Sequence, residues 1–157
     1  MTHTGLDNLL DRVAVRADKA DVFEVVRRAG DELVCAAGGS SAPAEYAVTF
    51  DVDHRTIWIA LRTADRWLSE SIEAALMHTG DKLEELIEDE LAELNCPMPV
   101  RVEHFRDDNL CYTFRSPVRL ATDQVADDTE LIAKTGAYLL AYEAAFRKLG
   151  DMSSGQS

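Results

Sequence analysis

The feature that most restricts the fold of this chain is a two-residue period along two neighbouring segments. Tyr46, Val48, Phe50 and Val52 alternate with smaller or polar residues, and Ile57, Ile59 and Leu61 alternate with Trp58 and Ala60. The polar residues 53–55 between the two segments are typical of a turn. Because successive side chains of a strand point to opposite faces, the pattern predicts a β-hairpin with one buried face.

Two other parts of the chain carry the signals of strands. Residues 33–36 predict a short strand, and a glycine- and serine-rich loop follows it at 38–43. The segment 100–115 predicts a second hairpin, because apolar residues alternate on both sides of a turn at 107–109. Pro117 ends the last strand or places it at an edge of the sheet.

The N-terminal part of the chain leaves two interpretations open. Apolar residues recur at spacings of three and four from Leu6 to Ala29, which predicts one helix stopped by Gly30. The rival interpretation ends the helix near Ala20 and makes residues 22–28 a strand, because this stretch is rich in β-branched side chains and its apolar face is shifted. The spacing favours the single helix.

Two further helical regions flank the second predicted hairpin. Residues 64–94 have helical spacing with an interruption at Gly80, and the part that follows the glycine is strongly acidic. The last helix is expected to begin near the acidic residues 127–128, which predict an N-terminal cap, and to be closed by Gly150. Residues 151–157 are polar and predict a disordered tail.

Together these segments predict a single α+β domain over residues 1–150 of a 157-residue chain. The expected order is helix-β-β-β-helix-β-β-helix. One antiparallel sheet of about five strands would pack against the helices. A chain of about 150 residues is long enough to enclose a core of its own.

The charge balance restricts the partners of such a domain. Asp and Glu number 29 against 16 Lys and Arg, which gives a formal net charge of −13. A surface of this sign repels phosphate backbones and anionic lipids, so we expect neither nucleic-acid binding nor membrane binding. The sequence shows no signal-peptide pattern, and its three cysteines are widely spaced. We therefore expect a cytoplasmic protein with reduced thiols.

The side chains that commonly carry chemistry form no recognisable site in the sequence. Carboxylates in the acidic helix at 81–93 mostly lie away from its apolar stripe, which predicts a solvated face and not a metal site. The four histidines are not paired at ligand spacing, and His104 is expected at the edge of the core. Cys111 could meet His104 across the second hairpin, yet nothing near it predicts an activated thiol. We expect no catalytic residues, no metal site and no cofactor.

Apolar residues outside the predicted core are candidates for binding a partner. If the isoleucines on either side of it face the core, Trp58 faces the other way, and the same argument places Phe105 on that face. Exposed tryptophan is a common anchor of protein contacts, although a helix of this chain covering that face is the alternative explanation. Trp67 is a candidate with the same two explanations, an anchor for a partner or a residue covered by this chain. Leu139 and Leu140 widen the apolar face of the last helix beyond one stripe, so we count them as candidates too.

The order of elements resembles the type III secretion chaperone-like fold, to which the YbjN-like proteins, described as bacterial sensory-transduction regulators, are similar. The segments that carry the resemblance are the hairpin at 46–61, the acidic helix at 81–95, the hairpin at 100–115 and the long last helix, and together they span residues 6–149. The chain differs from that pattern in its long middle helical region, which is broken at Gly80.

The resemblance implies a non-enzymatic protein, often a homodimer, that holds a partner polypeptide, and it carries over no catalytic residue. We therefore expect a chaperone- or regulator-like module that holds a polypeptide segment through apolar surfaces. The alternative is a small-molecule or divalent-metal-binding module, or an enzyme of unrecognised type. That alternative would need a pocket lined by His104, Cys111 or the acidic helix.

Overall fold

A computed structural model of the chain describes residues 3–37, 44–51, 53–63, 83–106, 112–120 and 128–154. The described residues form three helices and six strands. In chain order these are α1 (His3–Ala20), β1 (Phe23–Ala29), β2 (Glu32–Ala37), β3 (Glu45–Asp51), β4 (Thr56–Thr63), α3 (Leu83–Glu93), β5 (Glu103–Arg106), β6 (Tyr112–Arg119) and α4 (Thr129–Ser154).

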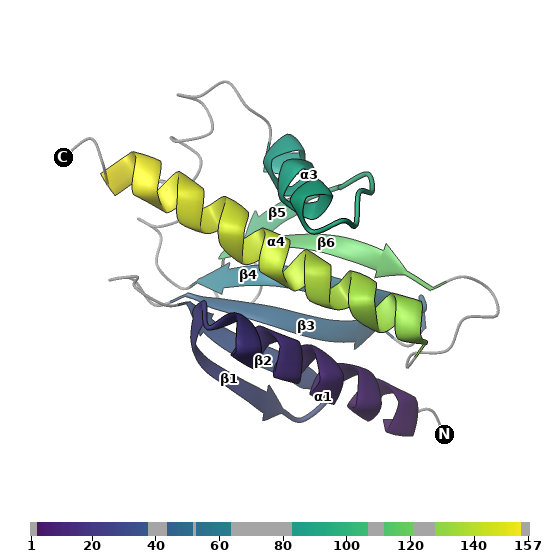
Figure 1. Ribbon diagram of the computed structural model, residues 1–157. Coiled ribbons are helices and arrows are strands. Elements are labelled where there is room, and N and C mark those ends of the chain that lie inside the picture. The colour runs from purple at the N-terminus through teal and green to yellow at the C-terminus, as the bar shows by residue number, and fades with distance from the viewer. Residues whose placement is uncertain are drawn as a thin grey trace.

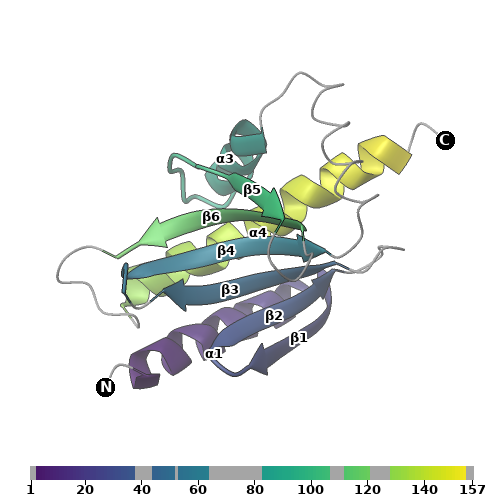
Figure 2. The same cartoon turned by 180° about the vertical axis from the view of Figure 1, so that it is seen from behind.

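The strands form one antiparallel sheet with the order β1-β2-β3-β4-β6-β5, and the sheet curls like half of a barrel. Helices α1 and α4 lie across one face of it, and α3 packs against α4 on the side away from α1 (Figure 1). From behind, the strands lie in front of α1 and α4 (Figure 2). We call the side turned away from these two helices the far face. Its residues include Val34, Ala47, Trp58, Ala60, Arg62 and Arg115.

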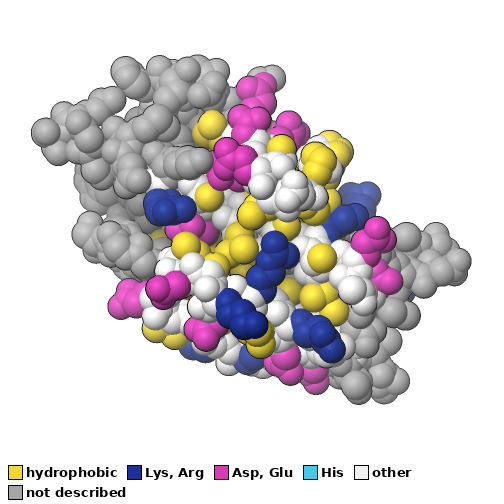
Figure 3. Space-filling view, in the orientation of Figure 1, with side chains coloured by type: hydrophobic (Ala, Val, Ile, Leu, Met, Phe, Trp, Pro, Cys, Tyr) yellow, Lys and Arg dark blue, Asp and Glu magenta, His cyan; other side chains and the backbone are white. Residues whose placement is uncertain are grey.

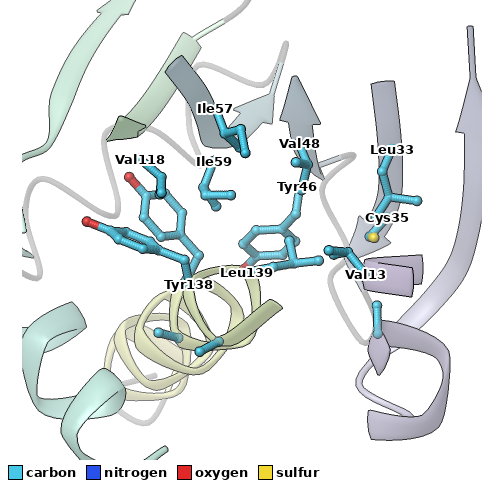
Figure 4. Packing of buried hydrophobic residues seen from close by; sticks show 14 of the residues in the cluster. Val13, Leu33, Cys35, Tyr46, Val48, Ile57, Ile59, Val118, Tyr138 and Leu139 are labelled. Carbon is cyan, nitrogen blue, oxygen red and sulfur yellow. The ribbon is translucent and has the colours of Figure 1, made fainter. Parts of the chain in front are cut away.

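The core between the sheet and the helices is built from the alternation that the sequence predicts. The buried residues of the β3–β4 hairpin are Tyr46, Val48, Ile57, Ile59 and Leu61. Tyr138 and Leu139 of α4 are directed toward these strands (Figure 4). Each large apolar side chain that is fully buried contributes about 1.5–3 kcal/mol. A slip of one residue would turn the whole apolar set away from α4, so this burial fixes the register of the hairpin.

Residues 23–29 form strand β1, so the single helix predicted over 6–29 is wrong and the rival interpretation is right. Helix α1 ends at Ala20, and Asp21 follows with a positive φ of 56°, a conformation that a short acidic side chain tolerates. Gly30, with a φ of 62°, then makes the turn from β1 into β2. The valines of this stretch favour an extended backbone, and β2 supplies the partner strand. The sheet therefore has six strands where about five were expected.

The two ends of α4 differ in how well they follow the prediction. Asp128 caps the helix as expected, because its carboxylate accepts a hydrogen bond from the N–H of Leu131 at 3.1 Å. Gly150 does not close the helix, since α4 continues to Ser154. Residues 151–154 are thus helical and not part of a disordered tail. A glycine inside a helix costs only about 1 kcal/mol, which a long and well-packed helix can absorb.

Some predictions fall outside the described residues, namely the loop at 38–43, the helical region up to Gly80 and the turn at 107–109. The acidic helix that was predicted after Gly80 is confirmed as α3. Pro117 lies in β6 beyond Arg115, where the pairing of β6 with β5 stops. At that point β6 has a paired neighbour on one side only, so the proline occupies an edge position, as predicted.

Candidate functional site

A row of small apolar residues runs across the middle of the far face. Val34, Ala47 and Ala60 stand side by side on β2, β3 and β4, and Arg115 of β6 is the next residue in the row. The three apolar side chains are buried although they lie on the face turned away from α1 and α4. They form a floor from which the longer side chains of neighbouring rows rise.

Trp58 of β4 stands beside this floor and is half-buried. The guanidinium carbon of Arg115 lies 3.8 Å from the centroid of the Trp58 ring. Arg115 is itself held by Glu103 of β5, whose Oε1 accepts a hydrogen bond from Nε at 3.1 Å and lies 3.1 Å from Nη2 in an ion pair. A cation over an indole ring is attracted to its π electrons, with a contribution of about 0.5–1 kcal/mol at exposed sites. This contact within the chain favours one orientation of the Trp58 ring.

A second group of charges lies on the other side of the floor. Arg62 of β4 stands opposite Glu45 of β3 and contacts it, and it also reaches Glu32 of β2 at 3.1 Å. In the register of the sheet Ala47 lies between Arg62 and Glu32, and its small side chain leaves room for the contact. Burial alone would lower the pKa of Arg62, but the hydrogen bonds to the two carboxylates outweigh it and raise the pKa above its ordinary value.

The structure separates the five side chains that the sequence singled out for partner binding. Trp58 lies on the far face, as the alternation of β4 predicts. The backbone of Phe105 lies in β5, but its side chain is outside what the structure describes, and Trp67 is outside the described residues altogether. Leu139 is fully buried between α4 and the sheet and thus belongs to the core. Leu140 is half-buried and lies outside that core cluster.

The ion pairs of the far face were missed by sequence reasoning. One of them had a partial signal: if the buried faces of the two strands are matched with Ile57 opposite Phe50, Arg62 also lies opposite Glu45. Opposite charges at such positions are a favourable cross-strand pair. The pairing of Arg115 with Glu103 had only the weaker signal of the second predicted hairpin, whose turn is less sharply defined by the sequence.

The acidic helix does more than present a solvated face, contrary to the prediction. Glu88 accepts a hydrogen bond from the backbone N–H of Val100 at 2.9 Å, and Glu84 accepts a longer one from the N–H of Val102 at 3.4 Å. The two carboxylates anchor the segment that leads from α3 into β5 and satisfy its main-chain donors. In the part of the chain that the structure describes, no group of three or more His, Cys, Asp and Glu side chains is arranged to hold a metal ion.

His104 and the cysteines are the remaining chemical candidates. The ring of His104 stacks on buried Phe114 with a centroid distance of 3.8 Å while staying exposed, so it lies at the edge of the core, as predicted. Cys35 is fully buried, and burial raises the pKa of its thiol to about 12. At neutral pH it is a protonated core side chain and not a nucleophile. Cys96 is a half-buried free thiol, and Cys111 lies outside the described residues.

Comparisons with models of protein families, with curated proteins and with solved structures found no match to this chain. Among the helical segments that the structure describes, none combines the length and the apolar character needed to cross a membrane. The far face and the fold are therefore the basis for a functional proposal.

Proposed function

We propose that this chain is a non-enzymatic cytoplasmic binding protein that holds a segment of a partner polypeptide on the far face of its sheet. Its role would be similar to that of the type III secretion chaperones or the YbjN-like regulators. One observation supports this above the others: Trp58, oriented by Arg115, stands on a sheet face that α1 and α4 leave uncovered (Figure 2). Tryptophan and arginine are among the residue types most enriched in binding hot spots.

The physical basis of binding is burial of apolar area around an anchor that is already ordered. A partner segment lays an apolar side chain against the exposed part of the Trp58 ring, and each Å² of apolar surface removed from water contributes about 25 cal/mol. Arg62 and Arg115 are held by carboxylates before binding, so little side-chain entropy is lost when polar groups of the partner meet them. The acidic surface elsewhere keeps the protein dispersed.

The net charge and the free thiols support the proposals of a polypeptide partner and of a cytoplasmic location. A net charge of −13 favours a polypeptide partner over nucleic acid or an anionic membrane. The free thiols of Cys35 and Cys96 favour a reducing compartment such as the cytoplasm. We also propose that the protein is a homodimer.

The test is a selection of peptides from a random display library on the immobilised wild-type chain. We expect apolar peptides whose binding shifts the fluorescence of Trp58. In a Trp67→Phe background Trp58 is the remaining one of the two tryptophans, so the signal is unambiguous. Trp58→Ala should weaken peptide binding about tenfold or more, because it removes the central anchor.

Val15→Ala is the matched control for this experiment. It also removes an exposed apolar side chain, but from α1 and not from the far face. Peptides that bind Val15→Ala as well as wild type and lose affinity for Trp58→Ala support the proposal. A selection without binders, or binders that are indifferent to Trp58→Ala, contradicts it.

A further inference from the structure

Helix α1 carries a basic stripe, made of Arg12, Val15, Arg16 and Lys19. These residues are three or four positions apart and therefore share one side of the helix. Arg12 and Lys19 are exposed, Arg16 is half-buried against α4, and Val15 in their midst is 54% exposed. The stripe thus combines three cations with an exposed apolar side chain.

The known contacts of the basic stripe do not neutralise its charge. Arg12 donates from Nε to the amide oxygen of Asn8 at 3.1 Å, and Arg16 donates to the backbone carbonyl of Ala133 at 3.0 Å. Both acceptors are neutral. Arg28 behaves differently, since it is paired with two aspartates of α1. The cations of the stripe are therefore able to meet carboxylates of another molecule.

Helix α3, on the other side of α4, carries an acidic stripe that is opposite in charge to the basic stripe. Its acidic stripe consists of Glu85, Asp89, Ala92 and Glu93. These four residues are exposed, and they lie on the side of α3 opposite its buried residues, which are Leu83, Ile87 and Leu91. No Lys or Arg interrupts the sequence of this helix. The stripe thus presents carboxylates with one small apolar residue among them.

The helix between the two stripes offers apolar contacts. On α4 the side chain of Ala133 is exposed, and those of Leu140 and Ala144 are half-buried. Acidic side chains gather over α3, Lys and Arg side chains lie over α1 and α4, and apolar surface lies between them (Figure 3). Exposed Asp11 and Asp18 lie beside the basic stripe on α1. The basic stripe, the apolar residues of α4 and the acidic stripe thus follow one another across this side.

We propose that a second copy of this chain docks on this side, so that the basic stripe of each copy meets the acidic stripe of the other. A twofold axis parallel to α4 and lying between the copies brings α1 of one opposite α3 of its partner and places α4 against its counterpart. The charged contact is then made twice, and Leu140 and Ala144 supply the apolar centre. The far face with Trp58 takes no part in this contact. This inference rests on the proposed function, because it assigns the interface of the proposed homodimer.

Charge also distinguishes the twofold axis parallel to α4 from an axis perpendicular to it. A twofold axis perpendicular to α4 would bring α1 against α1 and α3 against α3, and both contacts would set like charges against each other. The net charge of −13 on each copy opposes association at long range. At physiological ionic strength that repulsion is screened beyond about 8 Å, whereas charges in contact at the interface are screened much less.

The test uses charge reversal in two complementary variants of the full chain. Arg12→Glu/Lys19→Glu makes the basic stripe acidic, and Glu85→Lys/Asp89→Lys makes the acidic stripe basic. Each variant alone should associate about a hundredfold more weakly than wild type, because every stripe then faces its own sign. An equimolar mixture of the two variants should regain the dimer, since the reversed stripes match each other. Native mass spectrometry distinguishes the mixed dimer from both homodimers by mass.

Arg27→Glu/Arg119→Glu is the matched control. It also reverses two exposed cations, but they lie on the far face, so this variant should remain a dimer. Circular dichroism verifies that each variant is folded. Where a reversal unfolds the chain, Arg12→Gln/Lys19→Gln and Glu85→Gln/Asp89→Gln give the same test with a smaller effect.

The outcomes separate this interface from the broader proposal. A monomeric wild-type chain overturns both the interface and the homodimer. A wild-type dimer that survives both reversals, or a mixture that stays monomeric, overturns the interface alone. Peptide binding that depends on Trp58 is measured independently of all three results.

Discussion

Arg16 of α1 lies directly over Gly136 of α4. A Cβ atom added at Gly136 would meet Cδ of Arg16 at 2.9 Å and Nη1 at 3.1 Å. The same arginine donates a hydrogen bond to the carbonyl oxygen of Ala133 one turn earlier on α4. The glycine therefore lets an arginine cross from one helix to the other, at a cost of about 1 kcal/mol in helix propensity relative to alanine.

This contact predicts a coupling between the two positions. In wild type, Gly136→Ala gains helix propensity but displaces Arg16, so the free energy of unfolding should change by less than about 0.5 kcal/mol. In an Arg16→Ala background the same substitution should stabilise the chain by about 1 kcal/mol. Urea unfolding of the four proteins measures the coupling, and equal effects in the two backgrounds would show that the contact has no energetic consequence.

Buried thiol and phenol groups predict a loss of stability at alkaline pH. Burial raises the pKa of Cys35 from 9.0 and that of Tyr138 from 10.0, in both cases to about 12, and it raises the pKa values of Tyr46 and Tyr142 further still. Above pH 9 the unfolded chain releases protons that the folded chain retains, so the free energy of unfolding falls as the pH rises.

Cys35→Val isolates the contribution of the thiol. Between pH 9 and pH 11 wild type should lose roughly 2 kcal/mol more stability than this variant, because each group whose pKa is raised contributes up to about 1.4 kcal/mol per pH unit. Urea titrations at intervals across that range give the two curves. Parallel curves for the two proteins would mean that Cys35 ionises in the folded state as easily as in the unfolded one.

The carboxylate of Glu88 is predicted to support the entry into β5. Glu88→Ala leaves the N–H of buried Val100 without its acceptor, so the chain should lose about 1–2 kcal/mol of stability. Glu88→Gln keeps an oxygen at that place and should lose less. Glu85→Ala, which changes an exposed carboxylate of the same helix, should have an effect below about 0.5 kcal/mol. Similar losses for Glu88→Ala and Glu85→Ala would contradict the anchoring role.

Arg62 is predicted to stabilise the fold by neutralising the two carboxylates beside it. Arg62→Met leaves Glu32 and Glu45 without their shared cation and should destabilise the chain by about 1–2 kcal/mol at pH 7. Adding Glu32→Gln and Glu45→Gln should recover most of this loss, because the repulsion is removed. Thermal unfolding compares the single and triple variants, and an unchanged melting temperature in Arg62→Met would mean that the ion pairs make no net contribution.

The two strands of the hairpin at 46–61 and their buried face could be predicted, because burial on one face dictates which residues alternate. The exact pairing could not, since a three-residue turn at 53–55 would pair Val52 with Thr56, whereas the partner of Thr56 is Asp51. Residues 23–29 could not be assigned in the same way. Valine and phenylalanine fit one side of a helix or one side of a strand, and the choice depended on the pairing with β2 and on the backbone of Asp21. Contacts between segments far apart in sequence are not visible in local spacing.

The candidate site was also predictable only where it depends on local spacing. The period of β4 shows on which side of the sheet Trp58 lies, whereas the cation over its ring comes from β6, far along the chain. Leu139 was expected on a binding surface because α4 is apolar on more than one side. The side that carries Leu139 is covered within the chain, since the sheet packs on it, whereas Leu140 on another side stays half-buried. The periodicity of a sequence indicates that one side of a helix is buried, but it does not show whether the same chain or a partner buries it.

The strand order β1-β2-β3-β4-β6-β5 follows the chain through four strands and then exchanges the last two. The first four strands are joined in sequence and close only small loops, whereas β6 pairs with β4 across the whole segment that contains α3 and β5. Closing that larger loop costs more entropy, so the meander from β1 to β4 can form on the ribosome before β6 is synthesised. During that interval the free edge of β4 and the ring of Trp58 lack their neighbour, and the nascent chain is then most vulnerable to pairing with another molecule.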